Sequence, residues 1–348
     1  MLIVMRQGSG DSEVRDVLGR LDEMGFAGHV SQGVERTVIG VVGRTYPALK
    51  DTFEMWPGVS EVVPISRSHK LSSREFQPSS TVVRVGDLAI GDESVVVIAG
   101  PCAVESEEQV LQAARAVKAA GANILRGGAF KPSTSPYTFR GLGEEGLKIL
   151  VTAREETGMP VITEVMTPHD VELVSRYADV LQVGTRNMQN YMLLDEVGKA
   201  EKPVMLKRGM SATIQEWLLS AEYIMAQGNR QVMLCERGIR TFETYTRNTM
   251  DISAIPVIHR ESHLPIIADP SHGTGKWYLV SPLAAAAVAS GADGVMVEVH
   301  PDPESALKDG AQSLTFENFD RLMSEVARVA QAVGRKMVAG GVQAKAGE

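Results

Sequence analysis

The sequence predicts an α/β protein, a (β/α)8 TIM barrel preceded by a small α+β domain of the ferredoxin-like plan. Two patterns lead to this prediction. Over residues 1–66, strand-like and helix-like segments follow one another in the order βαββαβ. From about residue 94, short apolar segments alternate with segments of helical length, and eight such units are the pattern of a closed parallel barrel.

The first 66 residues supply the elements of the smaller domain. A helix is expected over residues 10–25, because apolar side chains recur there at helical spacing, and a second helix is expected over residues 46–56. The strand-like segments are residues 2–6, 27–32, 36–43 and 59–66. Small domains that bind amino acids as effectors often have this plan, but unrelated modules have it too, so the plan alone assigns no role.

A stretch rich in Ser, Arg and Pro follows and predicts a linker over residues 67–80. The barrel domain is then expected over residues 81–338, with a short strand at Thr81–Val85 before the first barrel strand. The last residues, 339–348, are small and polar and predict a disordered tail.

Eight apolar segments predict the barrel strands. They read VVVIAG, NILRGG, PVITEV, DVLQVG, PVMLKR, QVMLCE, PIIADP and GVMVEV. Helices are expected at 107–120, 144–158, 211–227, 277–290 and 316–338. A doubly wound sheet is the alternative, but the glycine-rich dinucleotide turn that usually follows its first strand is absent from the sequence.

Composition excludes several classes of protein. The formal net charge is −8, so the excess of cations that a general nucleic-acid binder needs is missing. No apolar run reaches the roughly 18 residues of a membrane span, and the first residues do not read as a secretion signal. The two cysteines, Cys102 and Cys235, are far apart in the chain and fit a reducing compartment. We therefore expect a cytoplasmic protein with no nucleic-acid or membrane partner.

Chemistry in such a barrel lies at the C-terminal ends of the strands. Cys102 follows the first strand, His272 follows the seventh, and Glu298 ends the eighth, with Asp309 in the loop beyond it. Each residue alone is more often structural, but strands 7, 8 and 1 are neighbours in a closed barrel. A thiolate, an imidazole and two carboxylates in one sector suit a divalent transition metal, with Mn, Fe, Co and Zn all left open.

Cations gather at the ends of the other strands. They are Arg126, Lys131, Arg186, Lys207 and Arg237. Five cations at one mouth repel one another unless anions lie between them, and arginine suits phosphate and carboxylate groups. A metal beside bound phosphates indicates that a carbonyl group of a phosphorylated substrate is polarised.

The motifs at these positions resemble those of a known family. "AGPCAVES", "LRGGAFKPSTSPYTFRGLGEEGL", "QVGTRNMQN", "VMLKRGM", "LCERGIRTFE", "ADPSHGTGK" and "GVMVEVHPDPESALKDGAQSL" resemble the class I 3-deoxy-D-arabino-heptulosonate 7-phosphate (DAHP) synthases. The domain in front resembles the ferredoxin-like (ACT-like) regulatory domain of one subclass. The resemblance covers nearly the whole chain except about the last ten residues. It implies a transferase that condenses phosphoenolpyruvate, D-erythrose 4-phosphate and water to DAHP and phosphate, the first step of the shikimate pathway to the aromatic amino acids.

The resemblance also implies roles for individual residues. Cys102, His272, Glu298 and Asp309 match the metal ligands, and the five cations match the phosphoenolpyruvate site. Lys131 lies where it exchanges a proton with water or with the aldehyde oxygen. Glu164 is a second candidate for activating water, although pairing with a neighbouring cation explains it equally well. The implied erythrose 4-phosphate site contains Pro132, Thr134, Ser135, Arg140 and Asp309.

Two positions depart from the family pattern. Ser133 stands where "KPRTSP" of the family has an arginine that contacts the aldose phosphate, and Arg140 stands where glutamine is more usual. We expect Arg140, with Thr134 and Ser135, to replace part of the missing charge. Trp277 follows "GTGK", where a basic residue is common, and nothing in the sequence explains it.

Two other functions remain open at this point. A 3-deoxy-D-manno-octulosonate 8-phosphate synthase shares the barrel and the chemistry, but "KPST" and the additional domain favour the four-carbon aldose. An amino-acid sensor with an inactive barrel is the other alternative, and the complete ligand set argues against it. The resemblance further implies inhibition by tyrosine or phenylalanine through the front domain, and assembly as a homotetramer, with a dimer left open.

Overall fold

The structure is a computed structural model that describes residues 1–33, 36–43, 45–46, 48–63, 69–132, 135 and 137–338. It divides into two compact units, residues 1–68 and 69–348. Each unit has a hydrophobic core of its own. The expected tail at 339–348, and Ser133 and Thr134 of the loop after the second barrel strand, lie outside the described residues.

The described part of the first unit has the predicted βαββαβ order and forms one antiparallel sheet with the strand order β2-β3-β1-β4. Its elements are β1 (Leu2–Met5), α1 (Asp11–Glu23), β2 (Ala27–Gln32), β3 (Thr37–Val42), α2 (Ala48–Glu54) and β4 (Val59–Val63). Ile3 and Met5 alternate with less buried residues along β1, while Val17 and Leu21, one helical turn apart on α1, lie in the same core. This unit is therefore the ferredoxin-like domain that the sequence predicts.

The described part of the second unit contains eight parallel strands in a closed barrel. Each strand pairs with the next along the chain, and β14 pairs with β7, with Glu298 opposite Gly100. The strands are β7 (Ser94–Gly100), β8 (Ile124–Arg126), β9 (Val161–Val165), β10 (Val180–Val183), β11 (Val204–Lys207), β12 (Val232–Glu236), β13 (Ile266–Ala268) and β14 (Gly294–Glu298). The predicted (β/α)8 barrel is confirmed.

The apolar strand sequences follow from burial on both faces. Along β7, Val96 and Ile98 belong to the core inside the barrel, whereas Val95 and Val97 belong to the layer between the strands and the surrounding helices. Successive side chains of a strand point to opposite faces, so a strand with two covered faces has no reason to alternate apolar and polar residues.

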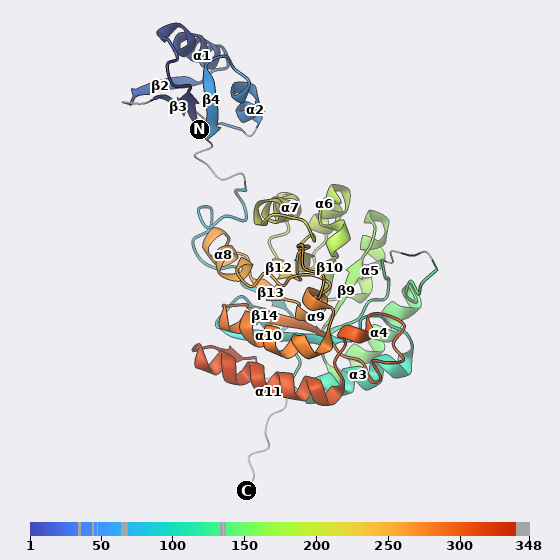
Figure 1. Cartoon of the computed structure of the whole chain (residues 1–348). Helices are drawn as coiled ribbons and strands as arrows, with labels where there is room; N and C mark the ends of the chain where they lie inside the picture. Colours follow the sequence, from blue (N-terminus) through green and yellow to red (C-terminus); the bar gives the residue numbers. More distant parts are fainter. Residues whose placement is uncertain are drawn as a thin grey trace. The chain divides into compact units, whose positions relative to one another are not determined.

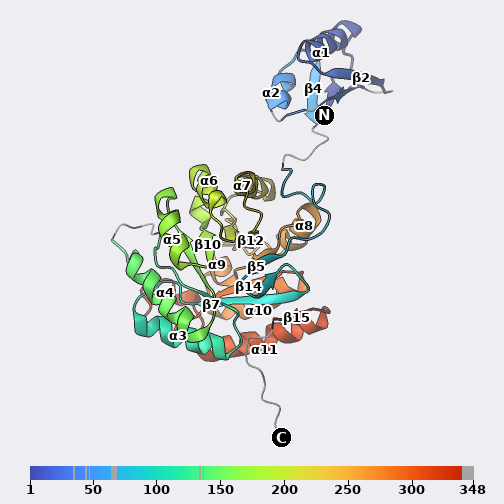
Figure 2. The ribbon, with the colours of Figure 1, turned by 180° about the vertical axis from the view of Figure 1, so that it is seen from behind.

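Helices surround the barrel, as Figures 1 and 2 show from opposite sides. They are α3 (Glu107–Ala119), α4 (Glu144–Thr157), α5 (Val171–Tyr177), α6 (Tyr191–Lys199), α7 (Ile214–Ala226), α8 (Ala254–Glu261), α9 (Pro270–Thr274), α10 (Val280–Ala289) and α11 (Phe316–Ala332). Short 3-10 helices lie at η1 (Pro168–Asp170), η2 (Thr185–Asn187), η3 (Trp277–Leu279) and η4 (Gly310–Gln312). In the described part of the chain, none of the helices combines the length and the apolar character needed to cross a bilayer.

A hairpin lies at the N-terminal end of the barrel. It consists of β5 (Val83–Val85) and β6 (Leu88–Ile90), and the side chains of Val83, Val85 and Ile90 belong to the core inside the barrel. A last short strand, β15 (Lys336–Met337), pairs with the start of β7. The hairpin covers the barrel at the end opposite to the strand ends where chemistry is expected.

Hydrogen bonds attach residues 69–80 to the barrel, although their composition predicts a linker. The Ser72 hydroxyl donates to Glu222 Oε1 at 2.8 Å, and Arg74 Nε donates to the carbonyl of His259 at 2.8 Å. The Ser262 hydroxyl donates to the carbonyl of Ser72 at 2.6 Å. The Ser- and Pro-rich composition thus reflects irregular backbone rather than separation from the barrel.

Candidate active site

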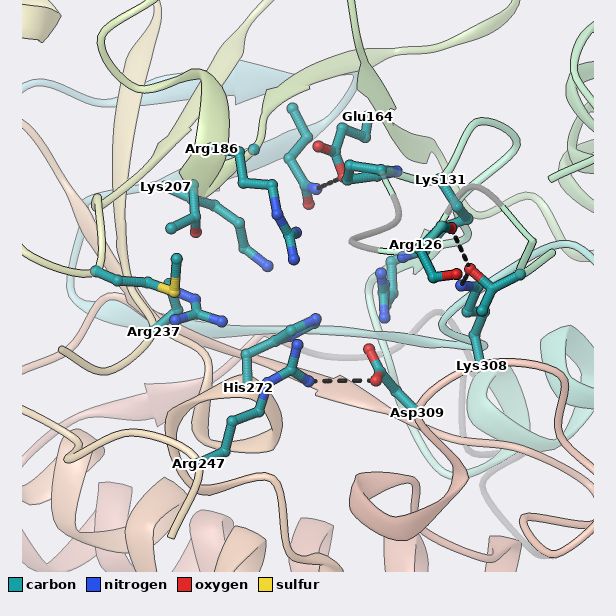
Figure 3. A pocket seen from close by; sticks show the side chains of 17 residues that line it. Arg126, Lys131, Glu164, Arg186, Lys207, Arg237, Arg247, His272, Lys308 and Asp309 are labelled. Carbon is teal, nitrogen blue, oxygen red and sulfur yellow. Dashed lines mark hydrogen bonds and ion pairs between the residues drawn. The ribbon is translucent and has the colours of Figure 1, made fainter. Parts of the chain in front are cut away.

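The C-terminal ends of the barrel strands surround a cavity of about 310 Å³ (Figure 3). All five predicted cations line it, together with Glu164, His272 and Asp309. Of the loop after β8, Lys131, Pro132 and Ser135 reach the cavity. The structure therefore gathers most of the predicted site residues around one space, as expected for the C-terminal face of a parallel barrel.

Four side chains with the chemistry of metal ligands lie close together beside this cavity. One ligand atom from each of Cys102, His272, Glu298 and Asp309 lies within 4.8 Å of the others. His272 Nε2 is 3.4 Å from Glu298 Oε1, and Cys102 Sγ is 3.5 Å from Asp309 Oδ2. A thiol, an imidazole and two carboxylates at this spacing fit a divalent transition metal.

The imidazole of His272 is oriented by Asp269. His272 lies on α9, and its Nδ1 is 2.8 Å from Asp269 Oδ2, so that its Nε2 faces the ligand cluster. A carboxylate behind a ligating histidine fixes the ring and its tautomer. Burial is the largest influence on His272 and lowers the pKa of its imidazole, which favours the neutral form that a metal ligand requires.

Asp269 also accepts a hydrogen bond from Lys207 Nζ at 2.6 Å. Burial opposes its ionisation, but His272 and Lys207 outweigh burial and hold the pKa of Asp269 well below its usual range. One ionised carboxylate thus positions both a residue of the ligand cluster and a cation of the cavity wall. The sequence shows Asp269 at a strand end but gives no sign of this double contact.

Glu298 is held by two further side chains. Arg126 Nη1 lies 2.5 Å from its Oε1, and Gln312 Nε2 donates to its Oε2 at 2.7 Å. Burial opposes its ionisation too, but His272 and Arg126 prevail and lower the pKa of Glu298. The carboxylate is therefore ionised at neutral pH, as a ligand must be.

The Cys102 thiol is buried. Burial, followed by the charge of Glu298, raises its pKa to about 12. The thiol therefore carries its proton until an opposing charge makes the thiolate favourable. A divalent cation among these four side chains provides that charge, which is consistent with a metal site.

Asp309 has an unusual backbone. Its φ of 51° and ψ of 31° place it in the left-handed region, and among the described residues it is the only one other than glycine with a positive φ. Non-glycine residues in this region are uncommon and cluster at functional sites. The turn that it makes before η4 brings the Asp309 carboxylate to the cluster.

Cations form the remaining wall of the cavity. Figure 3 shows Lys207 and Arg237 on one side, Arg186 near the middle, and Lys131, Lys308 and Asp309 on the other side. Burial lowers the pKa of Arg237 despite the nearby Asp269, so a bound anion would restore favourable surroundings to this guanidinium. Arg247 and Lys308 also line the cavity, and neither was predicted as a site residue.

Adjacent cations on β11 have different roles. Lys207 faces the cavity, whereas Arg208 Nη1 donates to Glu236 Oε2 at 2.9 Å and to Asp251 Oδ2 at 2.8 Å. Glu236 Oε1 in turn accepts from the backbone of Gly238 at 2.6 Å. This buried network holds the backbone on both sides of Arg237 and so positions its guanidinium.

Glu164 and Lys131 lie on the same side of the cavity. Glu164 accepts a hydrogen bond from Gln182 Nε2 at 3.4 Å. Burial alone would lower the pKa of Lys131, but acidic groups around it, Glu164 and Glu298 among them, oppose burial, and its pKa is raised. Lys131 is therefore protonated at neutral pH and suited to donate a proton or a hydrogen bond.

Arg140 lies apart from these residues. Its side chain is exposed and is not part of the cavity lining, although its carbonyl accepts from the backbone of Lys131 at 2.9 Å. Trp277 is 49% exposed and stands edge-on to Tyr278, with 6.0 Å between the ring centroids. The structure thus gives no support to Arg140 as a cavity residue, and it does not explain Trp277.

A (β/α)8 barrel with a cation-lined cavity and a ligand cluster at its C-terminal strand ends defines an enzyme for small anionic substrates. The chain belongs to the DAHP synthetase I family, whose model matches residues 66–333. Residues 1–67 match the DAHP synthase ferredoxin-like domain. The protein is therefore a transferase that forms carbon–carbon bonds, as the sequence motifs predict.

Curated relatives agree with this assignment. The chain is 50% identical over 337 residues to the phospho-2-dehydro-3-deoxyheptonate aldolase of Thermotoga maritima, covering 97% of this chain and 100% of that protein. It is 34% identical over 255 residues to the 2-dehydro-3-deoxyphosphooctonate aldolase of Syntrophobacter fumaroxidans, covering 68% of this chain and 88% of that protein. The match to the first of these relatives includes both domains, whereas the second match covers about the length of the barrel.

Solved structures show the same likeness. The crystal structure of the Thermotoga maritima DAHP synthase superposes with a TM-score of 0.93 at 49% identity, covering 97% of this chain and 99% of that one. A truncated form of the Thermotoga maritima enzyme superposes with a TM-score of 0.73 at 51% identity, covering 77% of this chain and 98% of that one.

Proposed function

We propose that the protein condenses phosphoenolpyruvate with D-erythrose 4-phosphate and water to give DAHP and phosphate, with a bound divalent metal ion. The observation that carries this proposal is a cavity with a wall of cations and, beside it, the four-residue ligand cluster, of which His272 and Asp309 line the cavity. The reaction needs both parts, because its two substrates carry phosphate groups and one of them presents an aldehyde that must be made more electrophilic.

Phosphoenolpyruvate would bind along the cationic wall. Arg186 and Arg237, with help from Lys207, would hold its phosphate, because guanidinium groups bind phosphate oxygens in pairs. Arg126 and Lys131 would face the carboxylate and the reacting carbons. Arg126 is already anchored to Glu298, so its position is defined before substrate binds.

Cys102, His272, Glu298 and Asp309 would hold the metal ion, and Mn, Fe, Co and Zn all suit this donor set. When bound, the ion acts as a Lewis acid on the aldehyde oxygen. Asp269 keeps the His272 ring turned toward the cluster, and Gln312 keeps the Glu298 carboxylate in place. These contacts fix the ligand atoms without involving the substrate.

Lys131 and Glu164 would move the protons of the reaction. C3 of phosphoenolpyruvate forms a bond to the aldehyde carbon, and protonated Lys131 donates to the oxygen that gains negative charge. Water then adds at C2, and Glu164 accepts its proton. Phosphate leaves when the bond between C2 and its bridging oxygen breaks, and the proton of the C2 hydroxyl passes to the departing phosphate as the ketone forms.

Aldose preference tests the proposed reaction. With manganese and phosphoenolpyruvate, we expect release of phosphate and formation of a seven-carbon product from D-erythrose 4-phosphate, measured by product mass and phosphate assay. Turnover restricted to D-arabinose 5-phosphate would identify the octulosonate synthase instead. Absence of phosphoenolpyruvate turnover with either aldose would point to a sensor with an inactive barrel.

We also propose that the front domain mediates inhibition by tyrosine or phenylalanine in a homotetramer of the cytoplasm. Deletion of residues 1–66 should abolish this inhibition and leave a catalytic rate close to that of the full chain. A truncated form of the Thermotoga maritima relative, which matches 77% of this chain, has a solved structure, which supports the feasibility of the deletion. Initial rates with and without each amino acid provide the measurement, and a truncated enzyme that tyrosine still inhibits would contradict the proposal.

A further inference from the structure

The cavity contains a lysine, Lys308, that lies within the last quoted sequence motif but has no predicted role. Lys308 lies in the loop between β14 and η4, directly before Asp309 of the ligand cluster. Its side chain is half-buried and lines the cavity, and its Nζ donates to the Thr138 hydroxyl at 3.0 Å. Thr138 in turn donates to the carbonyl of Ser135 at 3.0 Å. Lys308 thus joins the loop after β14 to the loop after β8 at the edge of the cavity.

The loop holds Lys308 in place. Asp302 donates through its backbone to His300 Nδ1 at 3.1 Å, and Leu307 donates through its backbone to Glu105 Oε1 at 3.0 Å. A Cβ at Gly310 would lie 2.0 Å from the carbonyl oxygen of Pro303, so the loop closes tightly on itself there. A lysine on a braced loop loses less freedom on binding an anion than one on a free surface.

The proposed reaction needs a second phosphate site, for the aldose, and the positions of the ligand cluster and of phosphoenolpyruvate limit where it can lie. The aldehyde carbon of the aldose must lie between the ligand cluster and phosphoenolpyruvate, whose phosphate would occupy the side of Arg186 and Arg237. The aldose phosphate is at the other end of its carbon chain, and repulsion between two phosphates keeps it away from that side. Figure 3 shows Lys308 across the cavity from Arg237, beside Asp309.

The other cation that the sequence missed is less suited to this role. Arg247 Nη1 donates to Asp309 Oδ1 at 3.2 Å and to Gln312 Oε1 at 3.1 Å. These bonds place its charge on a carboxylate of the ligand cluster. Lys308 contacts a hydroxyl-rich edge of the cavity formed by Thr138 and Ser135, and hydroxyls commonly complete phosphate sites.

We propose that Lys308 binds the phosphate group of the aldose substrate, supplying from the loop after β14 the cation that Ser133 cannot supply from the loop after β8. This inference rests on the proposed function. The site would accept a terminal phosphate monoester on a short sugar chain. Thr138 would position the ammonium group before the substrate arrives.

Comparison of a phosphorylated with an unphosphorylated aldose tests the proposal. In Lys308→Met, kcat/KM for D-erythrose 4-phosphate should fall roughly 10- to 100-fold, the usual effect of removing one charged hydrogen-bond partner of a phosphate. The kcat/KM for D-erythrose and the KM for phosphoenolpyruvate should stay near the wild-type values. Lys308→Arg should restore most of the loss, since it restores the charge. Lys199→Met, on the exposed face of α6 and paired with Glu196 at 3.0 Å, is the control.

Other outcomes would contradict the role of Lys308 or the proposed function. Equal losses with both aldoses, or no loss, would overturn the role of Lys308. A selective loss in Arg140→Gln, with Lys308→Met unaffected, would assign the charge to Arg140 and equally overturn it. If the wild-type enzyme instead uses D-arabinose 5-phosphate, the proposed function fails, and the same comparison with D-arabinose tests Lys308 separately.

Discussion

Replacement of Cys102 by alanine is expected to lower kcat at least about 1000-fold, because loss of metal-assisted polarisation costs several kcal/mol of transition-state stabilisation. The cluster has one sulfur among its four ligand atoms, and an alanine supplies no donor in its place. The variant should also lose bound metal. Steady-state rates at saturating substrate, and metal content after dialysis, measure the two effects.

The second cysteine provides a matched control. Cys235 lies on β12 within the core inside the barrel, and burial raises the pKa of its thiol to about 12, as for Cys102. Cys235→Ala should keep its metal and its turnover and lose about 1 kcal/mol of stability from the smaller side chain. A Cys102→Ala enzyme that retained both metal and turnover would remove the basis for the proposed metal site.

Substitution of Lys131 by methionine is expected to lower kcat about 1000-fold, in the range for loss of a general acid. Lys131 is protonated at neutral pH because its pKa is raised. Rates measured from pH 6 to pH 9 should therefore show no titration of Lys131. In the variant, the rate should be low over the whole range.

Lys148→Met serves as the control for this experiment, since Lys148 is exposed on α4 and contacts Glu145 at 3.5 Å. A structural role for Lys131 would lower thermal stability as well as rate, so the melting temperature of each variant distinguishes the two roles. If Lys131→Met kept a kcat near that of the control, another group would have to supply the proton.

Much of the fold and site follows from the sequence for a simple geometric reason. Strands of a parallel barrel all end at one face, so residues far apart in the chain, such as Cys102 and Glu298, are brought together by strand order alone. The repeated apolar segments identify the strands. The first polar residues after each strand are those expected at the C-terminal face of the barrel. The ligand cluster and the five cations could therefore be predicted.

Contacts within that face could not be predicted in the same way. Asp269 bridges His272 and Lys207, and Gln312 bridges Glu298 and Arg247. These pairings depend on loop conformation, which apolar periodicity does not specify. The same reason applies to Lys308, which reaches the cavity from a loop, and to Arg140, whose side chain is exposed although Thr138, two residues earlier, lines the cavity.

The left-handed backbone at Asp309 lowers the stability of the folded protein but places a carboxylate at the proposed metal site. A residue with a Cβ in this conformation lowers the stability of the folded state by roughly 1–2 kcal/mol. Glycine at this position would avoid that cost but would also remove the carboxylate. The aspartate thus lowers the stability of the turn in exchange for a carboxylate at the proposed metal site, so improvements in thermal tolerance should be sought elsewhere in the chain.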